Sequence, residues 1–423
     1  MIFGNESPEL RFCFPSRGAR FSDKLLRRLS RTTASGDFIP EVDGLRFIAI
    51  SAVILHPITD AYLRTTQRLG PVDLPAQWWT VFPRSDIITW GYAGYFGVQF
   101  FFVISGFILA LPYAQSYRDG AGRPPLRWYY LRRLVRLEPP YIINITLLFL
   151  LIALTNPGWQ RFISHLAASL FYLHGPVFAE ASWVNGVAWS LEVEVQFYLV
   201  MPLLATVFAV RTPTVMQAGL AIAILGLAYL VGSLISMDSY PRLKLSLLNY
   251  LQFFLAGFLL ADLYVGRAVE SYSRSYRGDI IAALAGAGIF LILTRRYDLY
   301  YLTPLLILAL YIGLFLGRLG HFCIRQRWIV AIGGMCYTIY LDHFMVIDLI
   351  APWTMQLASP ERALWQDFMI PCLLMIPAIL LSSALLFVLV EKPFMILSRA
   401  VGGRRRMQPS ASGNPTISML RSN

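Results

Sequence analysis

The chain has 423 residues, of which 57% are hydrophobic and 14% are charged, and its formal net charge is +12. One soluble core cannot bury this much apolar surface, so the composition excludes an ordinary soluble protein and indicates a membrane protein. The positive charge alone is compatible with nucleic-acid binding. However, the basic residues lie between apolar runs and not on one face, so no nucleic-acid partner is expected.

Ten apolar runs follow one another along the chain, each close to the length that a helix needs to cross the hydrocarbon layer of a membrane. The sequence therefore predicts an all-α, polytopic membrane helix bundle with about ten transmembrane helices. The expected spans are residues 46–63, 92–114, 139–154, 187–210, 214–235, 247–265, 279–294, 300–317, 329–352 and 367–390.

Lysine and arginine are unevenly distributed over the two sides that ten spans define. The termini and the loops on their side carry 26 of the 36 basic residues, whereas the opposite loops carry nine. Because cytoplasmic loops carry the excess of basic residues, both termini are expected in the cytoplasm.

Three regions follow from this topology. Residues 1–43 are expected to form a basic cytoplasmic tail, residues 44–395 the transmembrane domain, and residues 396–423 a basic, disordered cytoplasmic tail.

The four cysteines are too far apart in sequence for a metal cluster. They are Cys13, Cys323, Cys336 and Cys372. Neither a metal site nor a permanently bound cofactor is expected.

Between the third and fourth spans, apolar residues recur at helical spacing from Trp159 to Leu170. This pattern predicts a helix lying on the outer membrane surface. His165 and His174 lie on or beside it. We interpret both as interfacial histidines, with a catalytic role as the alternative.

Ionisable side chains inside spans are costly to insert and usually face a cavity or a partner. The candidates are Arg46, His56, Glu192, Glu194, Asp342, His343 and Asp348. Glu391 and Lys392 lie at the end of the last span, where snorkelling to the interface is the expected behaviour of both side chains.

Six segments occur in the order seen in a known family: EVDGLRFIAISAVILH, GVQFFFVISGF, YYLRRLVRLEPPY, AWSLEVEVQFYLVMPLL, CYTIYLDHF and VEKPF. From Glu41 to Phe394 the chain resembles the acyltransferase-3 family of integral membrane O-acyltransferases. The resemblance implies a ten-span enzyme of the bacterial inner membrane, surrounded by membrane lipid. It also implies transfer of an acyl group, expected to be acetyl, from acyl-CoA to a hydroxyl of a carbohydrate or glycolipid acceptor.

Arg46 and His56 match an arginine and a histidine that the family requires in its first span. This chain has nine residues between them, where the family pattern has ten. In an ideal helix they are about 15 Å apart along the axis and about 80° apart around it. An imidazole exchanges protons near neutral pH, so His56 is the candidate general base, with packing in the bundle as the alternative. Arg46 either contacts the acyl donor or orients the helix.

Arg132, Arg133 and Arg136 form a compact cationic cluster in the segment that precedes the third span. Guanidinium groups match phosphate oxygens, so the cluster is a candidate site for the phosphates of coenzyme A. Membrane topology alone is the alternative explanation for these residues.

The remaining candidates come from the fourth and ninth spans. Glu194 matches an acidic position of the family, and we expect it to orient the base, to bind acceptor hydroxyls or to pair with a buried cation. His343 matches a family histidine. It either lines the same cavity or packs in the core, with Tyr337, Tyr340 and Asp342 as expected neighbours. We interpret Ser105 as a helix-packing residue, because no nucleophile elbow surrounds it.

A transporter with Arg46, Glu194 and His343 binding substrate in mid-membrane is the rival function. No internal repeat is detectable in the sequence, which favours the acyltransferase. Because only residues 391–423 follow the last span, we expect any separate esterase-like domain to lie on a second chain.

Overall fold

The computed structural model describes residues 25–26, 28–31, 38–66, 90–91, 93–120, 125–234, 240–266, 274–359 and 361–403. Within these residues the regular secondary structure is helical, apart from an isolated β-bridge between Ser275 and Gly317. The main helices are α2 (Pro40–Thr66), α5 (Gly97–Arg118), α6 (Leu126–Thr155), α9 (Ala188–Leu204), α10 (Pro213–Tyr229), α12 (Leu247–Val265), α13 (Tyr276–Arg295), α14 (Thr303–Leu316), α16 (Arg327–Gly334), α17 (Cys336–Thr354), α18 (Leu364–Leu386) and α19 (Lys392–Gly403).

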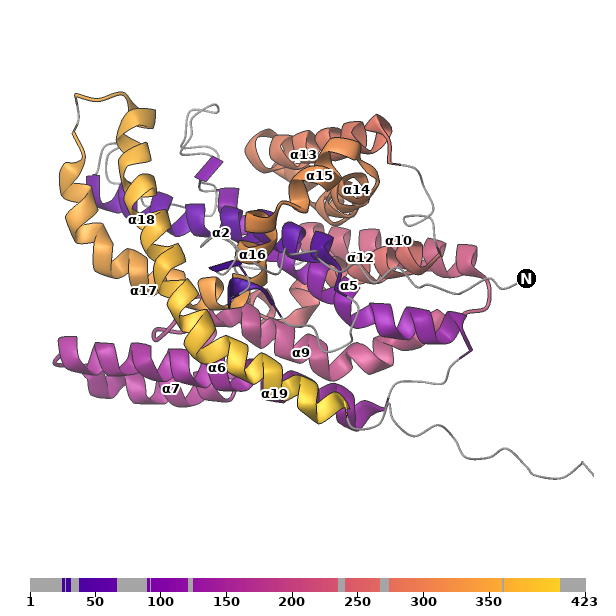
Figure 1. Ribbon diagram of the computed structural model, residues 1–423, viewed down its shortest axis with the longest axis horizontal. Helices are drawn as coiled ribbons and strands as arrows, with labels where there is room; N and C mark the ends of the chain where they lie inside the picture. Colours follow the sequence, from indigo (N-terminus) through magenta and orange to yellow (C-terminus); the bar gives the residue numbers. More distant parts are fainter. Residues whose placement is uncertain are drawn as a thin grey trace, which may run out of the picture.

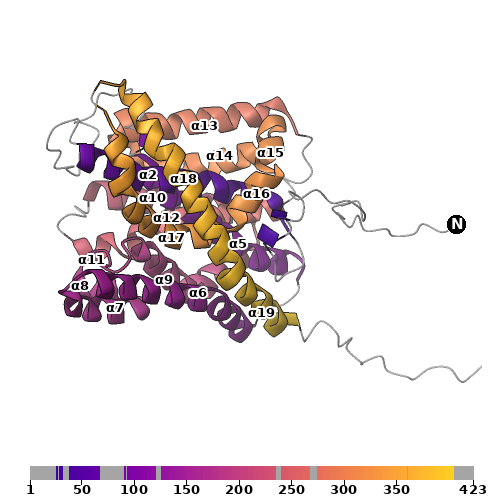
Figure 2. The ribbon, with the colours of Figure 1, turned by 60° about the vertical axis from the view of Figure 1, so that its left-hand side comes forward.

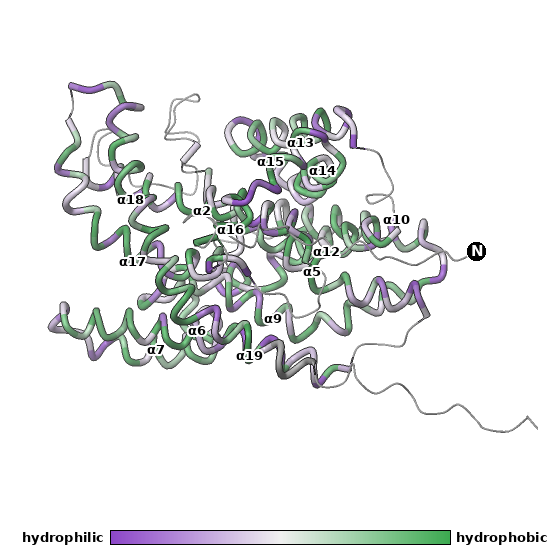
Figure 3. The backbone as a smooth tube through the Cα atoms, viewed as in Figure 1, coloured by the Kyte–Doolittle hydropathy of each residue, from purple (hydrophilic) through white to green (hydrophobic). Residues whose placement is uncertain are grey.

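The prediction of about ten spans is confirmed. In the described part of the chain, nine helices are long and apolar enough to cross a membrane, and α16 with α17 forms a tenth candidate that bends by 72° at its break. Each coincides with one of the ten apolar runs. Apolar residues run along the helices, as the green stretches in Figure 3 show.

Helix α2 lies inside the bundle and packs against α5, α16, α17 and α18. Small residues allow this close packing. A Cβ atom on Gly333 of α16 would collide with the carbonyl oxygen of Asp43, and one on Gly97 would lie 2.6 Å from the carbonyl oxygen of Ala49. Residues on several faces of α2 are therefore interior residues, which matters for Arg46 and His56.

Two groups of helices at the periphery are distinct in the ribbon view. Helices α13, α14 and α15 (Arg318–Ile324) form a separate layer at the top of Figure 1. Helices α18 and α19 follow each other as one long rod that runs across the bundle, and α19 packs on α6. Figure 2 shows the same rod in front of the bundle. Helix α19 extends to Gly403, which is eight residues beyond the boundary of 395 expected from the sequence.

The segment between α6 and α9 contains η2 (Trp159–Phe162), α7 (Ile163–Leu170) and α8 (His174–Phe178). His165 and His174 are packed inside this segment, with exposed fractions of 6% and 0%. Their expected position at the membrane interface stays a prediction. His165 Nδ1 lies 2.8 Å from His174 Nε2, and His174 Nδ1 lies 3.0 Å from the carbonyl oxygen of Glu180. The ring of His165 stacks on Trp183 with a centroid distance of 4.3 Å.

Buried polar contacts hold this segment against the bundle. The Glu192 carboxylate on α9 accepts hydrogen bonds from the backbone N–H groups of His174 at 3.1 Å and Gly175 at 2.8 Å. Asn185 donates to Asn144 of α6 at 3.0 Å and to the carbonyl oxygen of Leu341 of α17 at 3.2 Å. These buried polar contacts therefore fix the segment to α6, α9 and α17.

The paired histidines predict acid sensitivity of this segment. Burial lowers the pKa of His174 below its ordinary value of 6.5, and the neighbouring His165 acts in the same direction when charged. The unfolded segment therefore binds the proton more readily than the folded one. The stabilisation by neutral His174 is complete above pH 6.5 and is lost as the pH falls from there toward the lower pKa of the folded state.

We expect hydrogen exchange of residues 163–180, corrected for the intrinsic rate, to be faster at pH 5 than at pH 7.5. Replacing both histidines with phenylalanine should remove most of this difference, since aromatic packing is kept while titration is lost. Equal protection of the wild type at both pH values would contradict the prediction.

Candidate functional site

A cavity of about 100 Å³ lies between α2, α5, α6, α9 and α17. Along α5 it extends from Val98 to Leu109, which in an ideal helix corresponds to about 16 Å. It is thus elongated and not a spherical void. Its polar lining residues are Arg46, Ser105, Arg133, Arg136, Ser190, Glu194, Tyr198, Cys336, Tyr337 and Tyr340.

Helix α6 contributes the cationic part of the lining. Arg133 and Arg136 line the cavity, whereas Arg132, also predicted to bind the donor, is not among its described lining residues. The guanidinium of Arg133 lies 5.9 Å from the ring centroid of Tyr198. The Nε atoms of both Arg132 and Arg136 are buried and have no hydrogen-bond partner among the described residues. These positions suit an anionic ligand, because a buried guanidinium nitrogen without an acceptor is costly.

Arg46 of α2 reaches the same cavity but is held by a carboxylate. Its Nη1 atom lies 2.5 Å from Oδ1 of Asp43, one helical turn away, and Arg31 approaches that oxygen to 3.2 Å. Asp43 is only 2% exposed. Sequence reasoning missed Asp43, although its position three residues before Arg46 on one helix was a usable signal.

Glu391 was also misjudged from the sequence. It is 1% exposed and accepts a hydrogen bond from Thr338 at 2.5 Å, so the expectation that it snorkels to the interface is wrong. It ends the π-helical turn η7 (Phe387–Glu391), which joins α18 to α19. A π-turn holds one extra residue and so changes which side chains face the core. Its charge interacts with Arg31 and Arg136.

Ser105 and Glu194 face each other across the middle of the cavity. The Ser105 hydroxyl on α5 donates a hydrogen bond to Oε1 of Glu194 on α9 at 2.6 Å. The packing role expected for Ser105 belongs to its neighbour, since a Cβ atom on Gly106 would collide with the carbonyl oxygen of Phe254 on α12. Successive helical residues point about 100° apart, so Ser105 faces the cavity.

His343 of α17 is fully buried. Its Nδ1 atom lies 3.1 Å from the carbonyl oxygen of Ile339. A carbonyl can only accept, so in the neutral ring Nδ1 carries the hydrogen and Nε2 carries the lone pair. Nε2 is buried and has no partner among the described residues. The ring lies 5.8 Å from that of Tyr340, which lines the cavity.

Asp342, expected beside His343, instead accepts hydrogen bonds from Ser382 and Ser383 of α18. Its contacts therefore tie α17 to α18 and do not define the tautomer of His343.

His56 is absent from the described cavity lining. Its ring lies 5.7 Å from that of Tyr95, and its charge interacts with that of His343. Tyr95 in turn stacks on Trp189, the neighbour of the lining residue Ser190. Because α2 is an uninterrupted α-helix, Arg46 and His56 are about 15 Å apart along its axis. Only Arg46 reaches the cavity, while His56 lies near His343.

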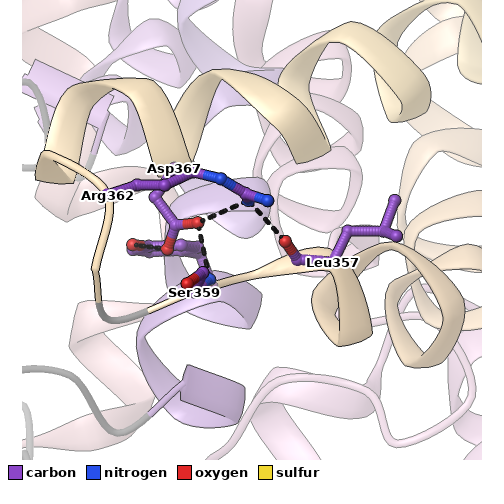
Figure 4. Close-up of polar contacts among 5 residues, drawn as sticks. Leu357, Ser359, Arg362 and Asp367 are labelled. Atoms are coloured by element: carbon purple, nitrogen blue, oxygen red, sulfur yellow. Dashed lines mark hydrogen bonds and ion pairs between the residues drawn. The ribbon is translucent and has the colours of Figure 1, made fainter.

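The far end of α2 is fixed by a buried carboxylate, shown in Figure 4. Asp367 at the start of α18 is 1% exposed and accepts a hydrogen bond from Tyr62 of α2 at 2.8 Å. It also accepts from the backbone N–H of Ser359 at 2.9 Å, and Arg362 approaches it to 3.4 Å. Figure 4 shows Ser359 and Arg362 converging on this carboxylate. The contact limits movement of the part of α2 that carries His56.

The arrangement has three chemical parts: guanidinium groups, a serine hydroxyl paired with a carboxylate, and two histidines. It can bind phosphate, polarise or attack a carbonyl group, and exchange protons. Within the described residues no group of three or more His, Cys, Asp or Glu is arranged to hold a metal ion.

Comparison with known proteins gives a family. Residues 39–387 match the family model described as an acyltransferase domain. The peptidoglycan O-acetyltransferase OatA of Listeria monocytogenes is 24% identical over 417 residues, which cover 86% of this chain and 57% of that protein. The O-acetyltransferase OatA of Staphylococcus aureus (strain NCTC 8325) is 23% identical over 348 residues, covering 75% and 52%.

The chain therefore spans little more than half the length of these relatives. No solved structure matches it significantly. The family model, however, covers most of the chain and includes every residue assigned to the cavity. The chain belongs to the acyltransferase-3 family.

Proposed function

We propose that this protein is a membrane O-acyltransferase that moves an acetyl group from acetyl-CoA to a hydroxyl of a carbohydrate or glycolipid. The observation that supports it best is the elongated cavity, which is lined by arginines and by a serine–glutamate pair and has two histidines near it, in a chain of this family. The peptidoglycan named for the Listeria relative suggests a cell-surface glycan as acceptor.

The charges in the cavity lining support the proposed position of the donor. Coenzyme A carries a ribose phosphate and a pyrophosphate, and Arg133 and Arg136 supply guanidinium groups in the lining. Arg46 is the third guanidinium at this cavity, already partly neutralised by Asp43. Phosphates bound here direct the thioester along the cavity toward Ser105 and Glu194.

The acceptor is activated by an imidazole. His56 is the proposed general base, because its ring lies beside an interior aromatic group and interacts with His343. The buried Nε2 atom of His343 is a hydrogen-bond acceptor. His343 is thus either a partner that orients the base or the base itself.

The rival function, transport of an acylated glycan, would use the same buried charges for binding without chemistry. Incubating the purified protein with radiolabelled acetyl-CoA and candidate glycans separates the two functions. Transfer of label to a glycan supports the acyltransferase. Glycan translocation in vesicles without any acyl transfer would support the transporter.

The donor site predicts a contrast among the arginines of α6. Replacing Arg133 and Arg136 together with glutamine should weaken acetyl-CoA binding at least tenfold, because charge-assisted contacts to phosphate are lost. Arg127→Gln is the matched control, since Arg127 is exposed on the same helix and lies outside the described lining. Acetyl-CoA affinity is measured on each purified variant after normal membrane insertion has been verified. Equal affinity of the double variant and the wild type would contradict the donor site.

The proposed base predicts that His56→Ala retains folding and donor binding but loses about 10² to 10⁴ in transfer rate. Wild-type transfer should rise with pH through the range in which imidazole titrates, near 6.5. His343→Ala is assayed beside it, with His165→Gln as a buried histidine outside the cavity. Near wild-type transfer by His56→Ala, together with loss in His343→Ala, would show that His343 is the base.

From the distribution of basic residues we propose the orientation of the protein in the membrane, with both termini in the cytoplasm of a bacterial cell. Reporter fusions after Ser116 and Arg405 should report cytoplasm, and a fusion near Asp73 should report the outer side. Positions 73 and 405 lie outside the described residues. An external signal at Ser116 would rule out this orientation and with it a cytoplasmic donor site.

A further inference from the structure

The contact between Ser105 and Glu194 is not used by the direct transfer described above. We propose that Ser105 is a nucleophile that receives the acyl group from the donor, and that Glu194 takes its proton. The chain would then pass through an acyl-serine enzyme before the acceptor is acylated. This inference rests on the proposed acyltransferase function and adds an intermediate to it.

The first support is the direction of the side chain. Ser105 lines the cavity, while the adjacent Gly106 takes the helix-packing position against Phe254. A serine needed only for close helix contact would occupy the position of Gly106. The hydroxyl of such a packing serine could donate a hydrogen bond to a backbone carbonyl of its own helix, as the Ser398 hydroxyl does to Met395 at 2.8 Å. Ser105 instead donates across to another helix.

The second support is the partner. The hydrogen bond to Glu194 measures 2.6 Å, and both residues line the cavity. A hydroxyl that donates to a carboxylate has an acceptor in place for the proton it loses during attack. This satisfies the geometric requirement for a nucleophile and its base without a nucleophile elbow.

The third support is the positive charge around the pair. Arg46, Arg133 and Arg136 line the same cavity. Attack on a thioester places negative charge on the carbonyl oxygen, and guanidinium groups in a site of low polarity stabilise that charge. A phosphate-bearing donor held by these arginines brings its thioester into the cavity that Ser105 faces.

The chemistry balances in two half-reactions. In the first, Ser105 Oγ forms a bond to the acyl carbon and the carbon–sulfur bond breaks. The proton of Oγ passes to Glu194 and then to the leaving thiolate, which departs as the free thiol. In the second, the acceptor hydroxyl attacks the seryl ester and gives its proton to the base. That proton returns to Oγ as the carbon–Oγ bond breaks, and no oxidant or metal is required.

Isotope exchange tests the first half-reaction without an acceptor. The full-length protein in detergent is incubated with acetyl-CoA and radiolabelled free coenzyme A. An acyl-enzyme interconverts the two pools, so label should appear in acetyl-CoA, whereas direct transfer gives no exchange. Acid-quenched protein should carry an acetyl group on the peptide that contains Ser105. His56→Ala should keep the exchange while losing transfer to the acceptor.

Four variants complete the experiment. Ser105→Ala and Glu194→Gln should lose exchange by about 10² or more. Ser105→Cys should form an acetyl thioester at position 105, which shows that a variant altered at this position still folds and binds the donor. Ser398→Ala, a buried serine outside the cavity, should behave as the wild type.

The outcomes are distinguishable. Transfer to the acceptor at the wild-type rate by Ser105→Ala would overturn the inference and leave the proposed function standing. The same holds if wild-type protein transfers acetyl groups but shows neither exchange nor label at Ser105. If the wild type neither exchanges nor transfers with any acceptor, the proposed function itself fails.

Discussion

The buried carboxylate of Asp43 is the interaction on which the arrangement of charges depends. An unpaired arginine is costly inside an apolar bundle, and several arginines close together repel one another. Asp43 contacts both Arg46 and Arg31 and is 2% exposed. At the same residue, Gly333 lets α16 approach the backbone of α2 closely. Close packing and charge neutralisation thus occur at one place.

Asp43 does not neutralise all the positive charge around the cavity. The basic groups here are Arg31, Arg46, Arg133 and Arg136, and the carboxyl groups are those of Asp43, Glu391 and Glu194. The arginines are in excess, and Nε of Arg136 has no partner among the described residues. An excess of buried guanidinium groups is stabilised by an anionic ligand, which is the reason that this end of the cavity suits phosphates. Of these three carboxyl groups, Glu194 is the one that accepts a hydrogen bond from a serine in the described cavity lining.

The sequence predicts some parts of this structure well. Ten spans follow from apolar length, and the proximity of Arg133 and Arg136 follows from helical spacing. The partners of buried charges are less predictable, because they come from different helices. Glu391 faces inward through a π-turn that has no simple sequence signature. His165 and His174 contact each other within a folded segment, and the amphipathic pattern of the sequence does not predict this pairing.

The short spacing between Arg46 and His56 is consistent with the roles proposed for them. If both side chains had to reach one point, a change of one residue would rotate one of them by about 100° and separate them. In this structure they serve different places, Arg46 at the cavity and His56 beside Tyr95 and near His343. Helix α2 packs against five neighbouring α-helices, including α15, so more than one of its faces is interior. Each side chain then needs only an interior face of its own, and the spacing is constrained by length along the axis more than by angle.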